Sequence, residues 1–175
     1  MNNTPHTNCL TLRLLHAAKG YKAVAFDIFD TLLKRDCAHQ AALGFAGARA
    51  AAEAETRQTL GREVTLAEIY AHPALRGTDP AAECAAELAM IAPNRPVAQA
   101  AAACHARGQK VYAVSDMYLP KEQIEAMLQK CGLDFLDGVF VSCEYGVQKR
   151  SGKLFKLFLQ QTALRPAEVL FVGDS

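Results

Sequence analysis

The sequence predicts an α/β protein in which helices flank a parallel β-sheet and a helical insertion follows the first strand. Short apolar runs, typical of strands buried on both faces, alternate with longer segments of helical spacing. Strands that alternate with helices form parallel sheets with right-handed crossovers. The insertion is indicated by roughly sixty alanine-rich residues between the first two apolar runs, with helical spacing and no convincing strand.

Capping signals and apolar runs place the individual elements. Gly20 ends the first helix, Thr65-Leu66-Ala67-Glu68 fits a capping box, and Asp79-Pro80 fits an N-cap followed by proline at the first helical position. Helices are therefore expected over residues 10–19, 40–59, 65–70, 79–91, 96–107, 120–130 and 151–161, and strands over residues 22–29, 110–116, 138–142 and 168–175.

Composition excludes several classes of protein. With 175 residues, 51% of them hydrophobic and 21% charged, the chain can bury a core and is not disordered. The net charge of +1 and the lack of a basic block argue against nucleic acid as a partner. No apolar run has membrane-spanning length and no signal peptide is apparent. Six scattered cysteines without a Cys-x-x-Cys pair favour reduced thiols in a cytoplasmic protein.

Polar residues follow the strands at one edge of the predicted sheet: Asp27, Ser115, Lys149 and Asp174. Ligands of open α/β sheets bind at the carboxyl ends of the strands. An isolated Asp27 could equally cap the next turn. Two carboxylates repel each other unless a cation such as Mg²⁺ lies between them, and Mg²⁺ commonly joins carboxylates to phosphate oxygens. Lys149 and the Ser115 hydroxyl could bind the remaining oxygens, with ionised Asp27 as a nucleophile.

These motifs resemble, in order, those of the haloacid dehalogenase (HAD) superfamily. Phe26-Asp-Ile-Phe-Asp-Thr-Leu-Leu33 resembles its first motif, Val114-Ser-Asp116 its second, Lys149-Arg-Ser-Gly-Lys-Leu-Phe155 its third and Val172-Gly-Asp-Ser175 its fourth. The resemblance covers residues 22–175. It implies a Rossmann-like core over residues 1–33 and 94–175, and an all-helical cap over residues 34–93 above the active site.

The resemblance also implies the roles of the site residues. Asp27 would be the nucleophile, Ser115 and Lys149 the phosphate-binding groups, and Asp27, the Phe29 carbonyl and Asp174 the ligands of Mg²⁺. The implied activity is a magnesium-dependent phosphatase that acts on a small phosphorylated substrate through an aspartyl-phosphate. Ser115-Asp-Met-Tyr-Leu-Pro120 and the third motif resemble a bacterial branch often joined to glycosyltransferases, so a fused C-terminal domain of that kind is an expected partner.

Two departures from the family pattern leave other functions open. Phe29 stands where the family's phosphatases carry a second aspartate as acid and base, and Asp30 could replace it only if the chain curls. Dehalogenase-type members also lack that aspartate, so a metal-free hydrolase with Asp27 as nucleophile is one alternative. The sequence stops at Ser175, where the family continues, so we expect a fragment. A degenerate ligand-binding or scaffolding module is the other alternative.

Several further residues allow two interpretations from sequence. Arg35 could reach an anionic substrate or be a solvated charge. Asp116 could orient Lys149 or cap the next helix. Met117 and Tyr118 could line the substrate entrance or pack in the interior. Cys37-x-His39 lacks a second pair of ligands, which argues against a zinc site.

Overall fold

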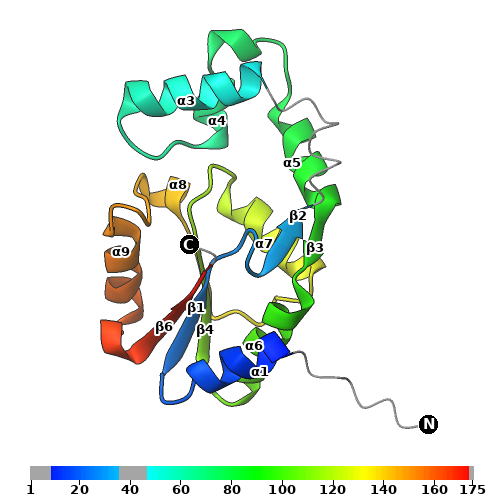
Figure 1. Cartoon of the computed structure of the whole chain (residues 1–175). Coiled ribbons are helices and arrows are strands. Elements are labelled where there is room, and N and C mark those ends of the chain that lie inside the picture. The colour runs from blue at the N-terminus through cyan, green and yellow to red at the C-terminus, as the bar shows by residue number, and fades with distance from the viewer. Residues whose placement is uncertain (1–8, 36–46, 174–175) are drawn as a thin grey trace, which may run out of the picture.

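The centre of the molecule is a four-stranded sheet of order β5-β4-β1-β6, in which all neighbouring strands are parallel. The computed structural model describes residues 9–35 and 47–173. Figure 1 shows the sheet between helices, the fold class predicted from the sequence. Its strands are β1 (Ala23–Phe26), β4 (Lys110–Ser115), β5 (Gly138–Val141) and β6 (Val169–Val172).

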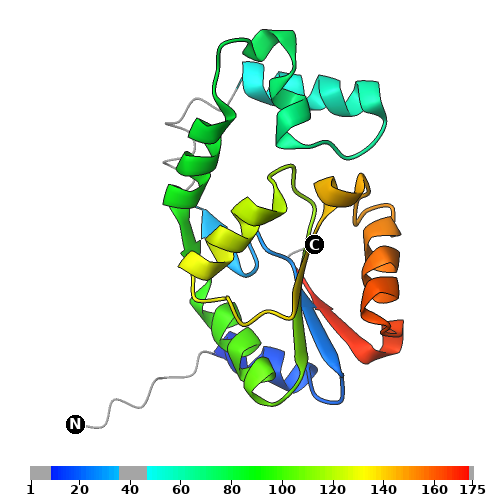
Figure 2. The same ribbon diagram turned by 180° about the vertical axis from the view of Figure 1, so that it is seen from behind.

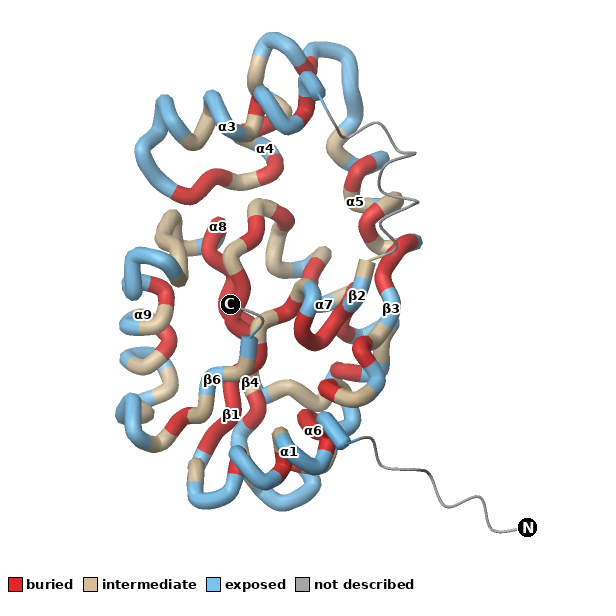
Figure 3. Tube along the Cα trace, in the orientation of Figure 1, coloured by how far each residue is buried: buried red, intermediate tan, exposed pale blue. Residues whose placement is uncertain are grey.

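Helices cover both faces of this sheet, as the back view in Figure 2 also shows. Alternate strand residues point to opposite faces. Val24 and Phe26 of β1 therefore join one apolar cluster, whereas Ala23 and Ala25 join the other. The first cluster lies beneath α1 (Cys9–Ala17), α6 (Arg95–Ala106) and α7 (Lys121–Lys130), and the second beneath α9 (Lys153–Thr162). All four residues of β1 are buried, and Figure 3 shows this strand in red at the centre of the sheet.

The segment between β1 and β4 carries a group of helices that lie apart from the sheet (Figure 1). The predicted capping box is present, because the Thr65 side chain accepts from Glu68 N and the Glu68 side chain accepts from Thr65 N. Asp79 caps the next helix by accepting from Ala81 N. The helices are α3 (Ala48–Leu60), α4 (Leu66–Tyr70), the 3₁₀ helix η1 (Pro73–Leu75) and α5 (Pro80–Met90). Residues 40–46 of the predicted helix 40–59 lie outside the described residues.

The expectation of no strand between residues 34 and 93 is wrong at both ends of that segment. β2 (Leu33–Arg35) pairs antiparallel with β3 (Ile91–Pro93), where the chain leaves the core and where it returns. Three residues are too few for a period-two pattern, and the partner strand lies far along the chain. Between these two strands, the described part of the insertion is helical. These two strands form the base of the insertion, which we call the cap.

Smaller differences occur after β5. Strand β5 ends at Val141, one residue before the predicted end, and the short helix α8 (Ser142–Tyr145), which was not predicted, follows it. Gly146 ends this helix with φ of 63°, a left-handed conformation that glycine adopts without strain. A 3₁₀ helix, η2 (Pro166–Glu168), precedes β6. Across the described ranges, no helix combines the length and apolar character needed to cross a membrane.

Candidate active site

Asp27 lies immediately beyond the carboxyl end of β1. Its backbone N–H donates to the carbonyl of Val172 at 2.8 Å, which extends the pairing of β1 with β6 by one residue. One carboxylate oxygen, Oδ1, accepts from Ile28 N at 2.7 Å. The side chain retains 15% of its exposure. Asp27 therefore both caps the turn and remains accessible to a ligand.

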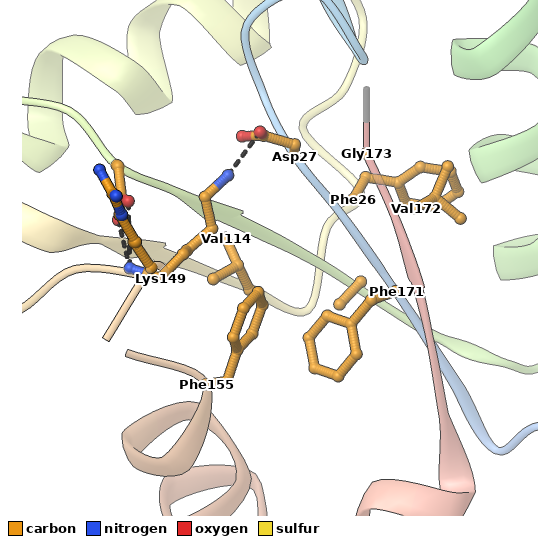
Figure 4. Close-up of a pocket in the computed structure, with 11 residues that line it drawn as sticks. Phe26, Asp27, Val114, Lys149, Phe155, Phe171, Val172 and Gly173 are labelled. Carbon is orange, nitrogen blue, oxygen red and sulfur yellow. Dashed lines mark hydrogen bonds and ion pairs between the residues drawn. The ribbon is translucent and has the colours of Figure 1, made fainter. Parts of the chain in front are cut away.

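Lys149 reaches Asp27 from the loop between α8 and α9. Its Nζ lies 2.5 Å from Asp27 Oδ2 in a charge-assisted hydrogen bond, shown in Figure 4. The backbone N–H of Lys149 donates to both carboxylate oxygens of Asp116, at 2.8 and 3.1 Å. Asp116 thus holds the backbone of the lysine. Of the two roles that the sequence allowed, orienting Lys149 or capping the next helix, the structure supports the first. Burial raises the pKa of Asp116.

A cavity of about 470 Å³ opens beside this ion pair. That volume lies within the range of small-molecule sites, which bury most of a ligand between apolar walls and a few polar groups. Figure 4 shows the ion pair at one side of the cavity and the rings of Phe155 and Phe171 at the other. The lining residues are Ala25, Phe26, Asp27, Val114, Asp116, Lys149, Arg150, Phe155, Phe171, Val172 and Gly173.

The sequence did not identify Arg150 or the aromatic wall of the cavity. Arg150 follows Lys149 directly, so its position in the chain was the available signal. The rings of Phe155, from α9, and Phe171, from β6, meet edge to face at 4.7 Å between centroids. Their contact depends on how α9 packs beside β6, which residue spacing does not reveal.

Two predicted catalytic residues are not among those that line the cavity. Asp30 is exposed and has φ of 59°, so the chain does curl after Asp27, but the side chain remains on the surface. Ser115 ends β4 and is buried, with 2% of its surface exposed. The register pairs Phe26 with Ala113, so Ser115 lies two residues beyond that pair at the same edge of the sheet. The structure therefore brings together Asp27 and Lys149, whereas Ser115 is buried at the same edge of the sheet and does not line the cavity.

The contacts of the Phe29 side chain are structural, not catalytic. The guanidinium of Arg35 lies 3.9 Å from the centre of the Phe29 ring, a cation–π contact. Arg35 Nε also donates to the buried carboxylate of Glu87 at 3.0 Å. Burial raises the pKa of Glu87, and Arg35 opposes that shift. Arg35 is thus part of an ion pair at the base of the cap, and neither of its two sequence interpretations describes this contact.

Met117 and Tyr118 follow the packing interpretation. Met117 belongs to the main apolar cluster. Tyr118 lies beneath the guanidinium of Arg49, which is 4.3 Å from the centre of its ring. Burial and the neighbouring Glu83 raise the pKa of Tyr118. The cap therefore covers these residues, which lie in the loop that follows β4.

The donor set for a metal ion is described only in part. Asp174 lies outside the described residues, as do Cys37 and His39. Within residues 9–35 and 47–173, no group of three or more His, Cys, Asp or Glu side chains could hold a metal. Each carboxylate oxygen of Asp27 accepts one hydrogen bond and keeps a second lone pair. Such an oxygen is a ligand that Mg²⁺ prefers, so the chemistry of Asp27 fits this ion.

Comparison with solved structures gives the same fold. A dehalogenase aligns with a TM-score of 0.65 and 18% identity, covering 90% of this chain and 78% of that one. The L-2-haloacid dehalogenase of Xanthobacter autotrophicus, with chloropropionic acid covalently bound, gives 0.59 and 22%, covering 86% and 69%. A HAD family enzyme of Bacteroides thetaiotaomicron gives 0.63 and 18%, covering 90% and 86%. At such identities these structures establish the fold alone.

The sequence itself identifies the family. No curated protein matches the chain. The model of the haloacid dehalogenase-like hydrolases matches residues 21–175, which includes the sheet, the helical insertion and every residue of the candidate site. The chain belongs to the haloacid dehalogenase-like hydrolase family.

Proposed function

We propose that this hydrolase is a magnesium-dependent phosphatase that acts on a small phosphate ester, with Asp27 as the nucleophile. The observation that carries the proposal is the ion pair of Asp27 and Lys149 at the wall of a cavity of about 470 Å³. A carboxylate at the end of a central strand, beside an ammonium group, can attack an electrophile. The same ammonium can stabilise charge on the group under attack.

The charges that line the cavity can accommodate a phosphate ester that binds together with one Mg²⁺ ion. Asp27 and Asp116 contribute two negative charges, and Lys149 and Arg150 contribute two positive ones, so the lining sums to zero. A phosphate monoester dianion adds two negative charges, and one Mg²⁺ ion would balance them. Asp27 would hold the ion, with the Phe29 carbonyl and Asp174 as its other proposed ligands. When bound, Mg²⁺ would neutralise charge on the phosphoryl oxygens.

In the proposed reaction, a carboxylate oxygen of Asp27 attacks phosphorus as the bond to the ester oxygen breaks. The alcohol leaves with a proton taken from water, and an aspartyl-phosphate remains. Water then attacks that phosphorus, which restores the Asp27 carboxylate and releases inorganic phosphate. Lys149 stabilises the phosphoryl oxygens in both steps. Because Phe29 replaces an acid and Asp30 is exposed, we expect slow turnover, since an acid–base group contributes about 10²–10⁴-fold.

A dehalogenase is the second candidate, favoured by the Phe29 ring that packs beneath Arg35. In that reaction Asp27 would displace halide from carbon, and no second carboxylate or metal is required. Similar folds are found in both classes. One is a haloacid dehalogenase with chloropropionic acid covalently bound, and another is a variant of the Bacteroides thetaiotaomicron enzyme in complex with magnesium and inorganic phosphate.

The test is hydrolysis of p-nitrophenyl phosphate with and without Mg²⁺, by the unaltered chain and by Asp27→Asn. We expect magnesium-dependent turnover that the substitution abolishes. Asp137→Asn is the matched control, because Asp137 also pairs with a lysine, Lys110 at 2.6 Å, but at the opposite end of β4. Release of chloride from 2-chloropropionate without phosphatase activity would identify the dehalogenase instead. A folded chain inactive in both assays would favour a binding module.

A further inference from the structure

The loop that joins α3 to α4 lies against the loops of the core that carry Asp116 and Lys149. We name residues 61–66, this loop together with the first residue of α4, the docking loop. Both views place this loop beside α8 and the chain that follows it (Figures 1 and 2). At one end, Leu66 N donates to the carbonyl of Tyr118 at 2.8 Å, two residues after Asp116. At the other end, a Cβ added to Gly146 would lie 3.5 Å from Arg62 Cδ.

Glu63, in the middle of the docking loop, makes the contact nearest to Lys149. Its carboxylate is buried, with 1% of the side chain exposed. Oε1 accepts from Arg57 at 2.6 Å and from Val64 N at 3.1 Å, so one oxygen is satisfied within the cap. Oε2 accepts from Gln148 Nε2 of the core at 2.9 Å. Gln148 directly precedes Lys149.

These contacts form a continuous polar line from the cap to Asp27. The line runs from Arg57 through Glu63 and Gln148 to the backbone of Lys149, whose side chain ends on Asp27. The Lys149 segment is irregular, with local backbone bonds to α8 and α9. Its described hydrogen bonds to the cap and to the residues that follow β1 and β4 come from the Gln148 side chain and from both ends of Lys149. A hydrogen bond to a charged group stabilises more than one between neutral groups.

We propose that Glu63 is a positioning residue: it fixes Gln148, and thereby holds Lys149 against Asp27 when the cap lies on the core. The role of Lys149 in turnover rests on the proposed function. The positional claim does not, because the geometry of the Lys149 segment can be measured without a substrate. Movement of the docking loop away from the core would break the bond of Glu63 to Gln148. Lys149 would then be held by Asp116, Asp27 and the local backbone bonds of its segment.

The test is hydrogen–deuterium exchange of the full chain, followed in the peptide that contains Lys149. Gln148→Glu places a second carboxylate against Glu63, and we expect exchange of this peptide to accelerate by roughly tenfold or more. Adding Glu63→Gln to that variant restores an amide opposite a carboxylate, and exchange should return most of the way. If the chain proves to be a phosphatase, kcat should fall in the single variant and recover in the double one.

Gln123→Glu is the matched control. Gln123 of α7 also bridges core and cap, because its Nε2 donates to the carbonyl of Cys84 in α5 at 2.7 Å, but no described contact links it to Lys149. This control should leave exchange of the Lys149 peptide unchanged. The proposal is overturned if Gln148→Glu does not accelerate exchange, if Glu63→Gln fails to reverse the effect, or if the control accelerates it equally. An inactive chain with the expected exchange pattern would refute the phosphatase and leave the positioning role intact.

Discussion

The core and the cap of this protein bury different kinds of side chain. Around the sheet, the buried residues are apolar or neutral. In the cap, the largest separate apolar cluster contains four buried residues, Ala52, Val64, Ile69 and Leu75. Among the described residues, all the charged side chains classed as buried lie in the cap segment: Arg49, Glu63, Glu83 and Glu87. The two regions therefore bury their interiors by different means.

The difference follows from composition. Alanine-rich helices remove little apolar surface from water, and burial stabilises in proportion to that surface. In the cap, Arg49 of α3 donates to both oxygens of Glu83 in α5, at 2.8 and 2.9 Å, and to Glu53 at 2.6 Å. The Tyr70 hydroxyl of α4 donates to the same Glu83 at 2.7 Å. One carboxylate thus joins three helices that share few apolar contacts. A buried ion pair is geometrically specific, although it is often no more stabilising than apolar packing.

The largest expected effect is in the core. Phe158 is fully buried, and its ring meets those of Tyr112 and Phe140 at 5.2 and 5.1 Å between centroids. Phe158→Ala should lower the free energy of unfolding by about 4 kcal/mol, because the cavity left behind forfeits both burial and packing. Urea denaturation measures this change. Phe171→Ala, at a ring that is 38% exposed, is the control and should cost far less. Equal losses would show that the aromatic cluster is not the centre of the core.

The second-largest loss of stability is expected when one of the buried charges of the cap is removed. Arg49→Met leaves the Glu83 carboxylate buried without a cation, with the hydroxyls of Tyr70 and Tyr118 as neighbours, and we expect a loss of about 3 kcal/mol. The double variant Arg49→Met, Glu83→Leu removes both charges and should recover most of that loss. Arg62→Met, in a pair exposed at the surface, is the control and should change stability far less than Arg49→Met. A double variant as unstable as the single one would contradict the comparison of core and cap.

Helices of the cap and of the core also differ in how their first turns are capped. In the cap, Asp79 and Thr65 accept backbone hydrogen bonds at the starts of α5 and α4, whereas the core helices α6, α7 and α9 begin without a bond to the N-cap side chain. Asp79→Ala should therefore cost about 1 kcal/mol, and Asp79→Ser much less. Hydrogen exchange along α5 would show the local loss. Faster exchange in the core but not in α5 would refute the assignment of Asp79 as the N-cap of that helix.

This contrast also explains how much could be predicted from the sequence. The core strands were predictable because each is a local apolar run, and the starts of α4 and α5 because capping residues signal them. The strands β2 and β3 were not, since each has three residues and its partner is distant in sequence. At the site, Asp27 and Lys149 were placed together correctly by the order of the motifs.

The remaining site features depend on contacts between distant segments. The left-handed backbone of Asp30 is not encoded by a glycine, so the exposure of its side chain could not be anticipated. The bond of Glu63 to Gln148 joins residues 85 positions apart, and neither residue type signals a buried contact. Specific polar pairs between cap and core have no periodic pattern, whereas apolar burial does.

The smallest expected effect concerns pH, and it separates surface ion pairs of the cap from buried ones. Arg62 and the Thr65 N–H lower the pKa of Glu68 from 4.5 to about 2. A carboxylate that is harder to protonate in the folded state stabilises the fold above the unfolded pKa, and loses that contribution as pH falls toward the folded pKa. The Glu68 contribution should therefore be complete above about pH 4.5 and disappear near pH 2. Glu68→Gln should lower stability at neutral pH by less than about 1 kcal/mol, because the pair is exposed, and the difference from the unaltered chain should shrink over that window. Urea denaturation of both proteins across the window measures it. A difference that does not vary with pH would mean that Glu68 acts through its shape in the capping box and not through its charge.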